Sequence, residues 1–151
     1  MKIKLKSSLF LFCSLIVFDI SAQNIYPVLI TKSGLLAGKI ISYNDSPNST
    51  VINSLPDTIS SEEIKNAFAL NAIYIDKSKG IQKLNINEFE FKVVESQDTT
   101  ILYCKSSLLT NDIRKKLKKI REDAYIYFQG IKAASDAGLE YRVTLLAFYI
   151  K

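Results

Sequence analysis

The sequence contains no histidine and no tryptophan, and it has only two cysteines among its 151 residues. The lack of histidine excludes Ser-His and Cys-His catalysis, zinc ligation by imidazole and imidazole-based pH switches. Two thiols are too few for a four-thiolate metal site. We therefore expect a protein that is not an enzyme, with no catalytic residues, no metal site and no cofactor.

Glycine and proline are also scarce, with five and three copies. The glycines stand singly, so no glycine-rich loop that would cradle a phosphate is present. The hydrophobic content of 48% and the charged content of 23% are those of a globular protein and exclude wholesale disorder. The length suits a single domain.

The first residues have the pattern of an export signal. Three lysines among the first six residues precede an apolar run over residues 9–18, which ends at Asp19. This run is too short for a stable membrane span, and small residues of the cleavable type follow it. We expect residues 1–22 to be a cleavable signal peptide and residues 23–151 to form one domain in the periplasm or at the cell surface. The alternative is a retained N-terminal anchor.

The mature chain would carry little net charge and one thiol. Cleavage removes three lysines and one aspartate, which lowers the net charge from +5 to +3. Cys104 is then the only cysteine, so it has no partner for an internal disulfide. The core must be stabilised by packing alone.

Alternating and apolar runs predict many short strands in the mature chain. Ser60 followed by Glu63 is a capping-box pattern that predicts a helix over about residues 61–68. Residues 145–150 are apolar on both faces, which predicts a strand with neighbours on both sides. These elements predict a mainly β protein, a β-sandwich with one or two short helices. Strands are expected over residues 23–31, 35–43, 67–76, 88–93, 100–105, 124–129, 139–143 and 145–150, with a loop over residues 44–50.

The clearest strand contains a change of phase. Apolar residues occupy every second position over residues 89–93, whereas Leu84 and Ile86 alternate in the opposite phase. The change predicts a β-bulge or a bend at Asn87 and Glu88. A hairpin with a four-residue loop over residues 96–99 is expected to follow. The predicted core consists of Phe89, Phe91, Val93, Ile113, Leu117, Ile126, Phe128, Leu146 and Phe148.

Two groups of oxygen-bearing residues have chemistry that a site can use. Glu88 and Glu90 lie two residues apart and can serve general acid–base catalysis, but any half-exposed strand shows the same pattern. Asp45 and Asn48 lie in one loop, where too few oxygen ligands are suitably spaced for calcium. Neither group is specific enough to predict a reaction.

A cysteine and several tyrosines allow further interpretations. Cys104 is a potential nucleophile without a histidine to activate it, so a small core residue is the simpler interpretation. Tyr125, Tyr127, Tyr141 and Tyr149 can form a stacking platform for sugars or bases, although tyrosines are common on exposed strand faces. The sequence leaves both interpretations of the tyrosines open.

The most specific feature is a basic helix after Thr110. Thr110 is a good N-cap, and Ile113, Leu117 and Ile120 form one narrow apolar row that predicts a surface helix. The functional interpretation is a docking surface for an acidic partner, and the alternative is a solvated face. Export argues against nucleic acid, and the single apolar row argues against membrane insertion. The candidate partner-binding residues are Arg114, Lys115, Lys116, Lys118, Lys119 and Arg121.

The order of motifs in the last third resembles a known domain family. A basic helix follows residues 107–110, and it precedes the strand motif at residues 123–128 and the turn at residues 136–138. The apolar residues 142–150 close the chain. This order is similar to the C-terminal domain of GldM, a periplasmic protein of the gliding-motility and type IX secretion machinery. The likeness extends over about residues 60–151 and includes the strand at residues 84–93.

The resemblance implies an immunoglobulin-like β-sandwich without enzymatic activity that docks onto a complex of the cell envelope. The chain lacks the long helical segments of full GldM, so it would be a free-standing copy of the terminal domain without a motor role. Two other functions remain open. One is a small exported enzyme that uses carboxylates, and the other is a periplasmic carrier for lipid or another apolar ligand.

The signal-peptide pattern makes a direct prediction about the exported protein. We expect the mature chain to begin at Gln23, because the charged start, the apolar run and the small residues before it match a cleavage site. Intact-mass measurement of the protein from the cell envelope checks this. Recovery of the uncleaved chain from membranes would contradict it.

Overall fold

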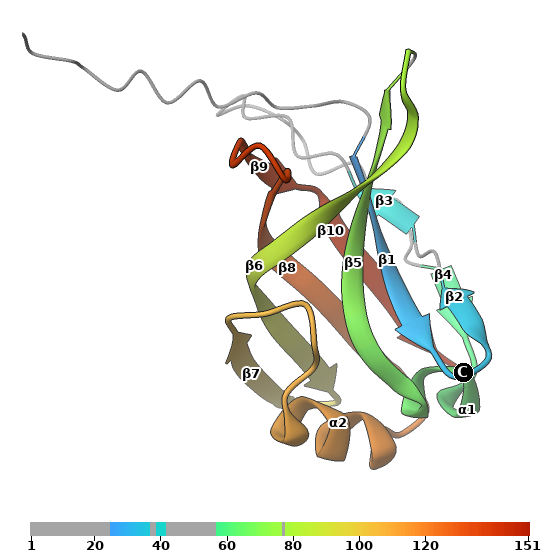
Figure 1. Cartoon of the computed structure of the whole chain (residues 1–151). Helices are drawn as coiled ribbons and strands as arrows, with labels where there is room; N and C mark the ends of the chain where they lie inside the picture. Colours follow the sequence, from blue (N-terminus) through green and yellow to red (C-terminus); the bar gives the residue numbers. More distant parts are fainter. Residues whose placement is uncertain (1–24, 37–38, 42–56, 77) are drawn as a thin grey trace, which may run out of the picture.

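The computed structural model of the chain describes residues 25–36, 39–41, 57–76 and 78–151 (Figure 1). The expected signal peptide, residues 1–22, and the expected loop, residues 44–50, lie outside the described residues. The strands are β1 (Ile25–Thr31), β2 (Gly34–Leu36), β3 (Lys39–Ile41), β4 (Asp57–Ile59), β5 (Ala67–Asp76), β6 (Gly80–Glu95), β7 (Asp98–Cys104), β8 (Ala124–Ala134), β9 (Glu140–Val143) and β10 (Leu145–Ile150). The helices are α1 (Ser61–Lys65) and α2 (Asn111–Lys118).

The strands form one curled sheet that packs against itself in two layers (Figure 1). Hydrogen bonds follow the order β2-β1-β5-β6-β8-β10-β3, while β7 pairs with β6, β9 with β8, and β4 with β10. Strands β2 and β3 are close in sequence but lie at opposite ends of this path, and β1 contacts β10. The curl therefore nearly closes. The structure confirms a mainly β, sandwich-like fold with two short helices.

Strand β6 belongs to both layers. Its first part pairs with β5, up to the partners Leu84 and Ala72, and its second part pairs with β8 and β7. The register with β8 shifts on both sides of Glu88, between Ile86 and Glu90. Opposite this point Gly130 of β8 has a φ of 59°, a conformation that glycine adopts without strain. The predicted bulge at residues 87 and 88 is confirmed.

A later segment fills the place that β6 leaves beside β5. The N–H of Leu70 donates to the carbonyl of Ser107 at 2.8 Å, and the N–H of Leu109 donates to the carbonyl of Phe68 at 2.9 Å. A bridge between Ala69 and Leu108 completes this short antiparallel pairing. Residues 107–109 thus satisfy the backbone groups at the start of β5, which would otherwise lack partners.

The two helices lie at one end of the curled sheet (Figure 1) and contact each other. Helix α1 has the predicted capping box, because Ser60 accepts from the N–H of Glu63 and the Glu63 carboxylate accepts from the N–H of Ser60. It ends at Lys65, earlier than the predicted residue 68. The chain is committed to β5 from Ala67 onward, where pairing with β1 and residues 107–109 outweighs helix propensity.

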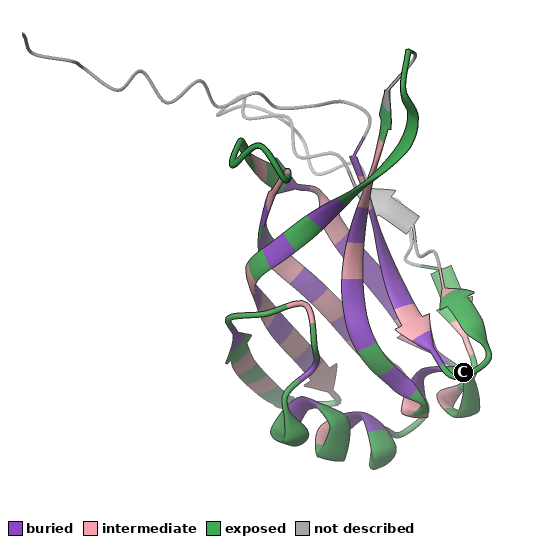
Figure 2. Ribbon diagram, in the orientation of Figure 1, coloured by how far each residue is buried: buried purple, intermediate pink, exposed green. Residues whose placement is uncertain are grey.

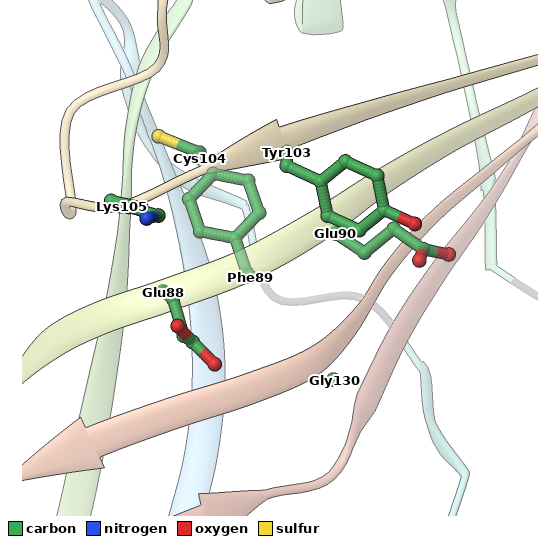
Figure 3. Close-up of a pocket in the computed structure, with 7 residues that line it drawn as sticks. All are labelled: Glu88, Phe89, Glu90, Tyr103, Cys104, Lys105 and Gly130. Atoms are coloured by element: carbon green, nitrogen blue, oxygen red, sulfur yellow. The ribbon is translucent and has the colours of Figure 1, made fainter.

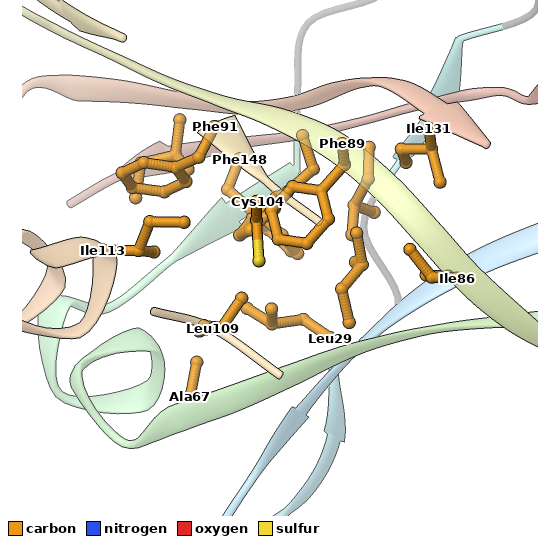
Figure 4. Close-up of a cluster of buried hydrophobic side chains, with 14 of the residues drawn as sticks. Leu29, Ala67, Ile86, Phe89, Phe91, Cys104, Leu109, Ile113, Ile131 and Phe148 are labelled. Carbon is orange, nitrogen blue, oxygen red and sulfur yellow. The ribbon is translucent and has the colours of Figure 1, made fainter. Parts of the chain in front are cut away.

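The core lies between the two layers and under the helices (Figures 2 and 4). Rings pack at its centre, with centroids 5.3 Å apart for Phe91 and Phe128 and 5.9 Å apart for Phe89 and Phe128. Every residue of the predicted core is buried: Phe89, Phe91, Val93, Ile113, Leu117, Ile126, Phe128, Leu146 and Phe148. The strand and helix phases derived from the alternation are therefore correct.

Two hairpin turns test the sequence-based expectations in opposite ways. Residues 135–138 favour a type I turn that ends in a left-handed glycine, and the structure confirms this, because Gly138 has a φ of 79° and donates to the carbonyl of Ser135 at 2.9 Å. The expected four-residue loop over residues 96–99 is wrong. Only Ser96 and Gln97 connect the strands, because the left-handed φ of Ser96, 52°, turns the chain sharply enough for Glu95 to pair with Asp98.

Strand β10 has partners along both edges, as its two apolar faces predicted. It pairs with β8 on one side, and on the other with β3 over its first half and β4 over its second half. The expected strand over residues 35–43 appears as the two short strands β2 and β3, with residues 37 and 38 outside the described part.

The ring contacts at the centre of the core predict a large stability loss on truncation. Phe91→Ala should lower the free energy of unfolding by about 3–5 kcal/mol, because it removes a fully buried ring and leaves a cavity. Phe68→Ala is the matched control, since Phe68 is 38% exposed and should lose far less. Chemical denaturation measures both values. Equal losses for the two variants would contradict the core described here.

Candidate functional site

Helix α2 is fixed to the body of the protein by its start and by one face. The Thr110 hydroxyl caps the helix by accepting from the N–H of Ile113 at 3.4 Å, and Asp112 lies in the first turn, where the helix dipole favours an acid. Ile113, Leu117 and Ile120 are buried, as predicted. Because residues 107–109 pair with β5 immediately before the cap, the helix has a fixed starting point.

Lys116 differs from the other predicted docking residues. Its ammonium group forms an ion pair with Glu95 at 2.5 Å, and the same carboxylate accepts from the backbone N–H of Arg121 at 3.3 Å. The side chains of Lys116 and Glu95 are only 26% and 19% exposed. The expectation that all six basic side chains project from the surface is therefore corrected. Lys116 ties α2 to the end of β6, and sequence spacing could not reveal a partner 21 residues away.

The pKa of Glu95 reflects two opposing influences. Burial raises this pKa. The hydrogen bonds from Lys116 and from the Arg121 backbone, together with the positive charges of both residues, lower it by more than burial raises it. The net result is a pKa below the ordinary glutamate value of 4.5. Glu95 therefore stays ionised at neutral pH and holds the basic helix in place.

The remaining basic side chains are exposed and form what is called the basic surface below. None of them has an ion pair with any residue in the described ranges. Arg114 and Lys118 lie one helical turn apart, as do Lys115 and Lys119, so the charges cover the solvent side of the helix. The basic surface consists of Arg114, Lys115, Lys118, Lys119 and Arg121.

Acidic residues lie at the ends of the helix rather than along the basic surface. Asp112 is in the first turn, while Glu122 and Asp123 follow Arg121. Asp123 also accepts a hydrogen bond from the Tyr149 hydroxyl at 2.5 Å, which raises the pKa of Tyr149. The middle of the helix therefore presents only positive charge to solvent.

A shallow hollow of about 250 Å³ lies beside the bulge in β6 (Figure 3). Glu88 and Glu90 border it, but each carboxylate faces a donor rather than another acid. Glu88 pairs with Lys132 at 2.7 Å, and this contact lowers the pKa of Glu88. Glu90 accepts from the Gln129 side chain and from Tyr103, whose pKa is raised by that bond. The hollow also borders Phe89, Cys104, Lys105 and Gly130.

The two glutamates therefore do not form an acid–base pair. A catalytic pair needs environments that separate the two pKa values and leave one carboxyl group protonated near neutral pH. The pKa of Glu88 is instead lowered by Lys132 and by the positive charge of Lys105. Tyr103 was missed by the sequence reasoning, although a correct length for the β6–β7 loop would have placed it opposite Glu90.

Three of the four tyrosines considered from the sequence gather on the outer face of one layer. The rings of Tyr125 and Tyr149 have centroids 5.0 Å apart, and those of Tyr125 and Tyr127 are 6.5 Å apart and nearly parallel. The Lys92 ammonium lies 5.9 Å from the ring centroid of Tyr127. The fourth, Tyr141, is elsewhere and stacks on Tyr74 at the edge of the core. The structure therefore brings together only three of the four tyrosines that were considered for a stacking platform.

Cys104 is buried, and its thiol donates to the carbonyl of Leu108 at 3.2 Å. This contact fits a packing role beside residues 107–109.

Within the described ranges, no group of three or more potential metal ligands is found. Asp45 and Asn48 lie outside the described residues. No helix in the described part of the chain is both long and apolar enough to cross a membrane.

The aromatic core bears on the apolar-ligand hypothesis. A lipid carrier would need an apolar cavity, and the space behind Phe89, Phe91 and Phe128 is the candidate place for one. These rings are at most 2% exposed, and Phe128 packs against both of the others, so the space between the three rings is filled.

The sequence matches no protein-family model, and no curated protein matches it. The functional interpretation therefore depends on the basic surface and on the resemblance described for residues 60–151.

The buried ion pair predicts a specific pH dependence of stability. Because the folded pKa of Glu95 lies below its unfolded value, its stabilising contribution is complete above about pH 5 and is lost as the pH falls through the folded pKa. Glu95→Gln should lower the free energy of unfolding by about 1–3 kcal/mol at pH 7, since Lys116 loses its partner.

The difference between wild type and Glu95→Gln should shrink below about pH 4.5. Glu122→Gln, at an exposed position near the same end of α2, is the control and should change little. Denaturation curves across this pH range provide the measurement. A constant difference at every pH would contradict the assigned role of Glu95.

Proposed function

We propose that the chain is an exported, non-catalytic binding module that docks onto a protein complex of the cell envelope through the basic surface. The partner presents an acidic face. The observation that carries this proposal is the set of five exposed cations on α2 and directly after it that have no ion pair among the described residues.

The fixed position of α2 supports docking rather than simple solvation. The cap at Thr110, the buried apolar row and the Lys116–Glu95 ion pair hold the helix in one orientation. A preformed charged surface loses little conformational freedom on association, and clustered charge accelerates encounter with a partner of opposite sign. Side chains dispersed over a mobile segment would give neither advantage.

The type of partner follows from the expected export and from the family resemblance. The signal-peptide pattern of residues 1–22 directs the chain out of the cytoplasm, which favours a protein partner over nucleic acid. The likeness of residues 60–151 to the C-terminal domain of GldM suggests a place in type IX secretion or gliding machinery. We therefore infer that the acidic partner is an envelope protein of such a complex.

Charge removal from the basic surface tests the proposal. Replacing Lys115, Lys118 and Lys119 together by glutamine should weaken binding to the partner by about tenfold at low ionic strength. Affinity capture from envelope extracts, with mass spectrometry and salt titration, identifies proteins whose retention depends on these lysines. Added salt should weaken binding of the wild type more than binding of the variant.

A second triple variant separates surface location from total charge. Replacement of the exposed Lys32, Lys83 and Lys151 by glutamine removes the same charge from other parts of the protein. This control should retain its partner and its stability. Equal retention by all three proteins at low salt would assign α2 to the role of a solvated face and reject the docking proposal.

A further inference from the structure

Strand β7 has an open edge. It pairs with β6 on one side, and no other strand of the described ranges pairs with it. At seven residues it is the longest described strand with only one neighbour, whereas β2, β3, β4 and β9 contain three or four residues each. Its open edge therefore leaves a row of backbone donors and acceptors without strand partners.

This edge lacks the features that usually prevent pairing with another chain. It contains no proline, and charged residues occur only at its ends, at Asp98 and just beyond at Lys105. Ile101 is 46% exposed and Tyr103 is 72% exposed. A regular strand with β-branched and aromatic side chains in solvent is well suited to strand addition.

The hairpin geometry determines which backbone groups face outward. Two-residue loops are closed by a hydrogen-bonded pair, here Glu95 and Asp98. Alternate residues of β7 from Asp98 then direct their N–H and C=O groups to β6. Thr99, Ile101 and Tyr103 direct theirs to the open edge.

The outward residues are arranged symmetrically about Ile101. When two copies of β7 run antiparallel with Ile101 opposite its counterpart, each Thr99 faces Tyr103 of the other copy. All three outward residues then exchange hydrogen bonds with the second strand. Pairs of β-branched and aromatic side chains across antiparallel strands are favourable. A shift of the register toward either end leaves some of these groups unpaired.

The three outward residues are therefore complementary to a second copy of the same strand in one antiparallel register.

We propose that two copies of the chain associate through antiparallel pairing of β7 about Ile101, which joins their sheets into one. This inference depends on the β7 edge alone and not on the proposed docking function. Its consequence for that function is a dimer with two copies of the basic surface.

Sedimentation and light scattering of the purified protein test the pairing across a concentration series. The wild type should reach twice the mass of one chain, and Ile101→Lys should remain at the mass of one chain because it places like charges opposite each other at the centre. Ile81→Lys is the matched control. Ile81 is a 73% exposed isoleucine on β6, and this variant should dimerise like the wild type.

A pair of double variants tests the register, in which Thr99 of one copy faces Tyr103 of the other. Thr99→Lys with Tyr103→Glu should retain the dimer because opposite charges face each other, whereas Thr99→Lys with Tyr103→Lys should abolish it because like charges do. Hydrogen exchange should also show that the amides of Thr99, Ile101 and Tyr103 are protected in the wild type and exposed in Ile101→Lys.

Three outcomes would overturn the proposal: a wild type that stays at the mass of one chain at its highest soluble concentration, a dimer that survives Ile101→Lys, and equal dimerisation of the two double variants at Thr99 and Tyr103. The first would leave the docking function untouched, because that function is tested by partner capture with substitutions on α2. Circular dichroism of each variant establishes that its fold is retained.

Discussion

The passage of β6 from one layer to the other is the constraint on which the rest of the structure depends. Strand β6 pairs with β5 only up to Leu84, and its later part pairs with β7 and β8 instead, so the beginning of β5 has no neighbour on that side from β6. Residues 107–109 take that place and form hydrogen bonds with the backbone groups of Phe68 and Leu70. The cap of α2 follows directly at Thr110. The path of one strand thereby determines where the basic helix begins.

The charges of α2 are divided between two tasks. Lys116 faces inward and is neutralised by Glu95, which secures the helix to the end of β6. The basic surface faces solvent, and its side chains lack ion pairs within the described part of the chain. Ion pairing of a half-buried lysine gives positional precision, while exposed charges contribute little to stability and remain available for long-range attraction. This division explains how a small protein with few polar motifs can still present a defined charged surface.

Local patterns in the sequence were sufficient for much of the fold. The change of phase between Ile86 and Phe89 predicted the bulge, and the capping box at Ser60 predicted the start of α1, because both depend on neighbours within a few residues. The ion pair of Lys116 with Glu95 and the pairing of Ala69 with Leu108 could not be predicted in this way. They depend on how distant segments meet after the sheet curls.

Two sequence-based errors have the same origin. The β6–β7 loop was expected to include Asp98 and Thr99, and α1 was expected to continue to about residue 68. In each case strand pairing determined the boundary. The candidate site was affected directly, since the loop error concealed the position of Tyr103.

Residues 107–109, which pair with the start of β5, should hold α2 rigidly on the sheet. Native-state hydrogen exchange of the amides of Leu70, Leu109 and Arg114 tests this, because these amides donate hydrogen bonds between residues 107–109 and β5 and within the first turn of α2. If α2 is held in this way, the three amides exchange only in openings with a free energy close to that of the core amide of Phe91. Rapid exchange at Leu109 and Arg114, while Phe91 stays protected, would show that the helix opens independently and would contradict a preformed basic surface.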